Sequence, residues 1–209
     1  MFAKRALTAG CLATILVVIG TFTPGWTIIS GEILTNMIDV ALSNQSFTSL
    51  RLGLWFQQKC TTESCATSVY PSAMYDVGGF DMSGITEFRI YTSFGILFSI
   101  AACILTLFHL LGKSPTLTGF AALLMFLFSG TVTWLASGKM INRYVLFDDY
   151  LDEAGISDNP LQFPYSTIVC GVGGILELFC SFLVGYNMWK LWNYSADFKH
   201  KRMEMSTYF

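Results

Sequence analysis

The sequence predicts an all-α membrane protein, in which a four-helix transmembrane bundle carries a small extracellular antiparallel β-sheet. Three observations lead to this prediction. Hydrophobic residues make up 53% of the 209 residues and charged residues only 12%, about half the charged fraction of an ordinary soluble domain. Four apolar runs are long enough to cross a bilayer, which needs about 20 residues. The long loop between the first two runs has the alternating apolar pattern and the paired cysteines of a small sheet.

Each predicted span is a run with almost no charge. The first three contain no Asp, Glu, Lys or Arg, and the fourth contains only Glu177. Because every backbone amide in hydrocarbon must be paired internally, we expect all four to be helices. The spans lie at about 6–29, 90–111, 117–137 and 165–188. They belong to one four-span domain over residues 1–209, with extracellular loops at about 30–89 and 138–164 and a cytosolic tail at 190–209.

The basic residues near the span ends predict the orientation. Lys4 and Arg5 precede the first span, and Lys113 lies in the turn between the second and third. Four more follow the last span, namely Lys190, Lys199, Lys201 and Arg202. We therefore expect a multi-pass membrane protein with both termini cytosolic. The alternative for the first run is a cleaved signal peptide, but no small-x-small cleavage site stands near its end.

The first loop carries a strand and a predicted disulfide. From Leu50 to Phe56 every second residue is apolar, which is typical of a half-buried strand. Cys60 and Cys65 follow and bracket four residues, a spacing that fits a β-hairpin and brings opposed Cβ atoms within bonding reach. On the oxidising side of the membrane these thiols are expected to form a disulfide.

Asn44-Gln45-Ser46 in the same loop is an N-glycosylation sequon. The predicted orientation places Asn44 on the luminal side during synthesis. We therefore expect Asn44 to carry a glycan.

The sequence shows no catalytic set and no cofactor motif. No His, Cys and carboxylate cluster has metal-ligand spacing, and the net charge of −2 gives no reason to expect a nucleic-acid partner. Catalytic, cofactor-binding and metal-binding residues are all expected to be absent. The expected surroundings are membrane lipid and other proteins.

Several residues of the first loop together resemble the claudin superfamily, which includes claudins, peripheral myelin and epithelial membrane proteins, and calcium-channel gamma subunits. The motif is Trp26, Gly53-Leu54-Trp55, Cys60 and Cys65, with Arg89 at the start of the second span. The segment between Trp55 and Cys60 is longer than claudins usually have. The resemblance therefore points to a divergent, invertebrate-type claudin-like protein.

This resemblance implies a left-handed bundle below a sheet of about four first-loop strands and one second-loop strand. We expect Tyr144–Phe147 to supply the fifth strand, and Trp26 and Trp55 to lie at the bilayer interface. The implied function is a cell-junction protein of the plasma membrane, which contributes to the paracellular barrier or to cell contact and associates with itself in cis and in trans. The alternative is an auxiliary, gamma-type subunit that regulates the gating or trafficking of an ion channel.

Three further features bear on function. Glu177 is either a polar contact to another helix or subunit, or a neutral acid hydrogen-bonded inside the bundle. The acidic excess of both loops is either a solvated face or a cation path. The tail ends with Thr207 and Phe209 in the positions of a PDZ ligand, so a PDZ scaffold is an expected partner.

Overall fold

The computed structural model describes residues 2–30, 47–69, 76–77, 80–81, 84–112, 115–153 and 161–206. Asn44, Thr207 and Phe209 lie outside these ranges, so the structure does not bear on the predicted glycan or the predicted PDZ ligand.

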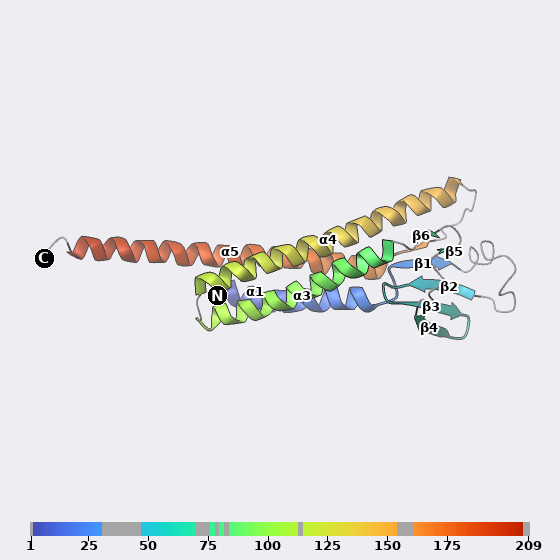
Figure 1. Cartoon of the computed structure of the whole chain (residues 1–209), viewed down its shortest axis with the longest axis horizontal. Coiled ribbons are helices and arrows are strands. Elements are labelled where there is room, and N and C mark those ends of the chain that lie inside the picture. The colour runs from blue at the N-terminus through green and yellow to red at the C-terminus, as the bar shows by residue number, and fades with distance from the viewer. Residues whose placement is uncertain are drawn as a thin grey trace.

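Four long helices form one bundle, as Figure 1 shows. They are α1 (Phe2–Phe22), α3 (Gly84–Leu110), α4 (Pro115–Glu153) and α5 (Tyr165–Ser206). Each helix packs on two neighbours, in the cyclic order α1, α3, α4, α5. All four are long and apolar enough to cross a membrane. The predicted fold class, a four-helix membrane bundle with a small antiparallel sheet, is confirmed.

Four helix ends differ from the predicted spans, and one of them is the start of α3, which lies at Gly84 and not near residue 90. The first helix ends at Phe22 and not near residue 29, because Pro24 cannot continue it. In contrast, α4 extends to Glu153 and α5 to Ser206, well beyond the predicted ends at 137 and 188. The spans were predicted from apolar content, but a helix does not stop where charge begins. Neither extension contains a Gly or Pro after Gly138 and Gly185, so nothing breaks the helix.

The centre of the bundle is a seam of small and hydroxyl side chains. On each helix the buried residues recur at alternating spacings of three and four, the 3.5-residue period of left-handed helix packing. On α3 the seam residues are Phe88, Thr92, Gly95, Ser99, Ala102, Thr106 and His109. On α4 they are Gly119, Ala122, Phe126, Ser129, Thr133, Ala136 and Met140.

Glycines let the backbones of α1 and α5 come into contact. A Cβ atom added to Gly20 would lie 2.6 Å from the amide nitrogen of Cys170. A Cβ atom added to Gly173 would lie 3.0 Å from the amide nitrogen of Val17 and 3.1 Å from the carbonyl oxygen of Ala13. Close approach of this kind provides the dispersion contacts that hold helices together in lipid, where no hydrophobic force acts between them.

One end of the bundle carries a five-stranded antiparallel sheet, visible beyond the ends of α1 and α3 in Figure 1. Its order is β4-β3-β2-β1-β7. The strands are β1 (Thr27–Ser30), β2 (Phe47–Leu52), β3 (Phe56–Thr61), β4 (Cys65–Val69) and β7 (Leu161–Gln162). A separate pair consists of β5 (Asp76–Val77) and β6 (Phe80–Asp81). Four strands of the five-stranded sheet thus precede α3, and one follows α4.

Two expectations about the sheet were wrong in detail. The alternating run from Leu50 to Phe56 is not one strand, because the chain turns between Leu52 and Phe56. The fifth strand is Leu161–Gln162, which pairs with Ile28 and Ile29. Tyr144–Phe147 lies inside α4, where no residue breaks the helix.

We predict that Gly173→Leu destabilises the bundle by about 2 kcal/mol, because the new side chain would overlap the backbone of α1. The control is Val172→Leu, next to it on α5 but 45% exposed on the outer surface. Thermal unfolding of both variants in detergent or nanodiscs measures the difference. Equal stability of the two would show that α1 and α5 are not packed as closely as described.

Candidate functional site

The segment that joins α1 to β1 is a tight corner at the sheet end of the bundle. The backbone N–H of Trp26 donates to the carbonyl of Leu52 at 2.9 Å, which starts the pairing of β1 with β2. The indole N–H of Trp26 turns back and donates to the carbonyl of Gly20 at 2.7 Å. That carbonyl is one of the last four of α1, which have no partner within the helix. The side chain of Trp26, the last residue of the corner, thus caps the helix that precedes it.

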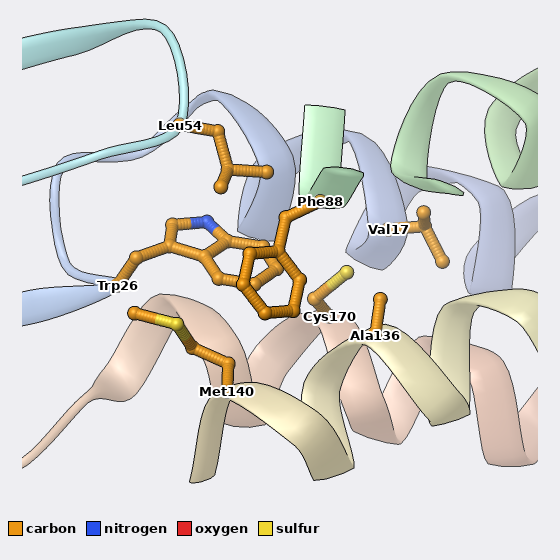
Figure 2. Close-up of a cluster of buried hydrophobic side chains, with 7 residues drawn as sticks. All are labelled: Val17, Trp26, Leu54, Phe88, Ala136, Met140 and Cys170. Atoms are coloured by element: carbon orange, nitrogen blue, oxygen red, sulfur yellow. The ribbon is translucent and has the colours of Figure 1, made fainter. Parts of the chain in front are cut away.

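The ring of Trp26 is buried in the core and is 1% exposed. Figure 2 shows it near side chains from all four helices and from the loop after β2. The ring of Phe88 lies 6.4 Å from it, and Leu54 and Met140 belong to the same buried cluster. The expectation that Trp26 lies at the bilayer interface was therefore wrong. Its polar N–H is satisfied internally, so it does not need the interface.

Gly53, Leu54 and Trp55 form the turn that brings the sheet down onto the bundle. The backbone N–H of Gly53 donates to the carbonyl of Phe56 at 2.9 Å. A Cβ atom at Gly53 would lie 2.9 Å from that oxygen and 3.2 Å from the Cα atom of Pro24. A side chain there would separate the turn from the corner. Leu54, 1% exposed, enters the cluster around Trp26.

Arg89 ties this turn to α3. Its Nε donates to the carbonyl of Leu54 at 2.5 Å, and its guanidinium lies 5.4 Å from the centre of the Trp55 ring. Trp55 in turn stacks on Phe22 at the end of α1, with ring centroids 6.1 Å apart. Trp55 is half-buried, and its indole N–H has no hydrogen-bond partner among the described residues. The turn is therefore fastened to two helices at once.

The start of α5 also contacts the corner, which sequence reasoning missed. The backbone N–H of Ser166 donates to the carbonyl of Gly25 at 3.1 Å, and its hydroxyl lies 2.7 Å from that of Thr23. The Tyr165 hydroxyl donates to the carbonyl of Pro24 at 3.0 Å. Only Pro164 marks this place in the sequence, as a residue that favours a helix start.

Sequence reasoning also missed two contacts between α3 and α4 near the corner, one an ion pair and the other a cation–π contact. Lys139 forms an ion pair with Glu87 at 2.6 Å, and the guanidinium of Arg143 lies 5.1 Å from the ring of Phe88. Both bases come from the part of α4 that was predicted to be loop. The Lys139–Glu87 pair is exposed and adds little stability. The sequence offered no signal for either contact, because each depends on α4 remaining helical past residue 137.

The predicted disulfide between Cys60 and Cys65 is confirmed, with an S–S distance of 2.04 Å. The two residues face each other across β3 and β4, next to the hairpin turn. Cys60 is four residues along β3 from Phe56, which corresponds to about 13 Å from the end of the Trp55 turn. The seven residues of the motif therefore separate into two places. Five of them, with Phe88, form what we call the junction cluster (Trp26, Gly53, Leu54, Trp55, Phe88 and Arg89), and the two cysteines lock the hairpin register farther out.

Glu177 lies inside the bundle and is fully buried. Its Oε2 and the carbonyl oxygen of Gly95 each lie 2.6 Å from the hydroxyl oxygen of Ser129. That hydroxyl has one hydrogen, and the Gly95 oxygen can only accept. Both short contacts are satisfied together if a neutral Glu177 donates to Ser129 and Ser129 donates to Gly95. The arrangement favours an internal neutral acid that links α3, α4 and α5 over a contact to another subunit.

These groups do not have the arrangement of a metal site. Within the described residues, no three or more His, Cys, Asp or Glu side chains are placed to hold a metal ion. What the junction cluster can do is mechanical, because it fixes the sheet to the helices.

No protein-family model matches this sequence, and no curated protein is significantly similar to it.

We predict that Trp26→Phe lowers the free energy of unfolding by about 2 kcal/mol, because the Gly20 carbonyl is left buried without a partner. Trp55→Phe is the matched control, since it removes an indole N–H that bonds to nothing in the described chain. Thermal unfolding of the purified variants measures both. A loss for Trp55→Phe as large as that for Trp26→Phe would contradict the capping role.

We also predict that Glu177→Gln changes the free energy of unfolding by less than about 1 kcal/mol, because an amide N–H can donate to Ser129 as a neutral carboxyl does. Glu177→Ala should cost about 2 kcal/mol or more through the cavity it leaves. If Gln were as destabilising as Ala, the carboxyl would have to act as a charged group, contrary to the arrangement described.

Proposed function

We propose that the protein is a claudin-like adhesion protein of the plasma membrane, with both termini cytosolic and the sheet outside the cell. It contributes to cell contact or to a paracellular barrier by associating with copies of itself, side by side and across the gap between cells. The observation that carries the proposal is the rigid attachment of the sheet to the bundle through the junction cluster.

Rigid attachment matters for adhesion because ordering a flexible domain at the moment of binding costs affinity. Here β1 follows α1 after four residues, the Arg89 side chain ties the turn after β2 to α3, and the first residues of α5 bond to the corner. The sheet is thus held at one height and angle relative to the helices. Every residue of β4, the strand at one edge of that sheet, is exposed. Such a surface is suited to repeated contacts within a membrane and across a gap.

The resemblance to the claudin superfamily supports the same proposal. Five of its motif residues meet at one place in the structure, although they come from three separate segments of the chain. A chance match to the motif would not require these residues to touch.

The test of function is expression in cells that form no junctions of their own. We expect the protein to concentrate where two expressing cells touch and to stay dispersed where an expressing cell touches a non-expressing one. The second kind of border is the internal control, because trans association needs the protein on both sides. Dispersed protein at both kinds of border, together with co-purification of an ion-channel subunit, would favour the auxiliary-subunit role instead.

The orientation is tested separately through Asn44. If the sheet is outside, glycosidase treatment should increase the mobility of the wild-type protein, and Asn44→Gln should abolish the shift. A wild-type protein with no glycan, whose sheet epitopes are reached by antibody only after permeabilisation, would reverse the proposed topology.

The tail is the expected route to a cytosolic scaffold. We predict that deletion of residues 207–209 leaves surface delivery unchanged but disperses the protein from contact sites, because Thr207 and Phe209 are the PDZ-ligand positions. Imaging in cells without a wild-type copy measures this. Full retention at contacts after the deletion would show that the sheet alone sets the location.

A further inference from the structure

A groove lies on the outer surface of α3, below the Trp55 turn. Its volume is about 270 Å³, and its lining combines the Trp55 side chain with one stripe of α3. The stripe begins at Thr86 and Arg89 and continues through Ile90 and Phe94 to Leu97. Ile90, Phe94 and Leu97 are each about half exposed. The groove is therefore open to whatever surrounds the bundle at the sheet end.

The chemistry of the groove changes along its length. At the end nearest the sheet stands the Arg89 guanidinium, with the hydroxyl of Thr86 one turn away. At the other end Phe94 and Leu97 are purely apolar. Arg89 and Leu97 are eight residues apart, which corresponds to about 12 Å along a helix. That distance is close to the hydrocarbon depth of one leaflet, about 15 Å.

A phospholipid changes from polar to apolar over a similar length. Its phosphate is complementary in charge to a guanidinium, which recognises phosphate better than other side chains do. Its acyl chain matches the apolar stripe below. A partner transmembrane helix fits less well, because close helix approach requires small residues. Ser93 is small, but its neighbours in the lining, Ile90, Phe94 and Leu97, are large.

We propose that this groove is a binding site for one phospholipid of the leaflet that adjoins the sheet. The phosphate lies at Arg89 and one acyl chain lies along Ile90, Phe94 and Leu97. Because Arg89 also bonds to the carbonyl of Leu54, a lipid here contacts the same guanidinium that fastens the sheet to α3. The proposal requires only that the bundle spans a bilayer, and it is independent of the adhesive function.

The test uses the full-length protein in a non-ionic detergent, with a trace of added phosphatidylcholine that carries a diazirine on its acyl chain. After illumination, mass spectrometry maps the cross-linked peptides. We expect labelling to concentrate on the stripe between residues 86 and 97. Excess phosphatidylcholine should compete about tenfold better than diacylglycerol, which has the same chains but no phosphate.

Two variants make the test specific. Ser93, an exposed residue in the lining, is replaced by Trp to fill the groove, and labelling of the stripe should fall about tenfold. Ile104→Trp is the matched control, since Ile104 is exposed on the same helix but does not line the groove. Arg89→Gln should remove the preference for phosphatidylcholine over diacylglycerol. If Arg89→Gln does not fold, the comparison of Ser93→Trp with Ile104→Trp decides.

Labelling that is spread evenly over the exposed faces of all four helices and is unchanged by Ser93→Trp would overturn the proposal. The lipid would then contact the helices without a preferred site. Protection of the stripe by a co-purified polypeptide would overturn it too, because the groove would then be an interface with another protein.

Discussion

The indole of Trp26 lies where a membrane-length helix has to become a strand, and most of the junction depends on it. A helix that ends inside a protein leaves carbonyls that water cannot reach. The indole N–H supplies a partner for one of them, the Gly20 carbonyl, while the ring fills the space between α1, α3, α4 and α5. Because the backbone of the same residue bonds to Leu52, the cap of the helix and the first bond of the sheet belong to one residue. The sheet cannot tilt without disturbing both.

The bundle below this junction is held together by features that differ from those of a soluble core. Lipid is as apolar as leucine, so the outer surface carries Ile, Leu and Phe, and the inner seam carries Gly, Ala, Ser and Thr. Gly20 and Gly173 allow backbone contact between α1 and α5. Ser129 and Glu177 add a hydrogen-bonded link between α4 and α5 at the same seam. Close contact between small side chains, together with hydrogen bonds such as that of Ser129 with Glu177, holds these helices together.

The sequence was sufficient for the fold class because membrane length and low charge are global properties that packing cannot override. The Cys60–Cys65 hairpin was also predictable, because its spacing is local. Helix ends were not, since α4 and α5 continue through charged residues that carry no stop signal. The position of Trp26 was missed because an aromatic residue at a span end usually faces the interface, and only the Gly20 carbonyl explains its burial. Contacts such as Ser166 with Thr23 join segments far apart in the chain, and no local pattern records them.

The sheet and the sheet end of the bundle are one cooperative unit by this account. Native-state hydrogen exchange of the protein in nanodiscs can show whether they open together, because it measures the opening free energy of each segment. The amides of Trp26 and Ser166 bond across the corner to Leu52 and Gly25. Their exchange rates should lie within about tenfold of those of the strand amides of β1 and β2. The amides in the first turns of α5 should be protected to the same degree. Strand amides that open freely while the corner and the helices stay protected would show that the sheet is a separate unit.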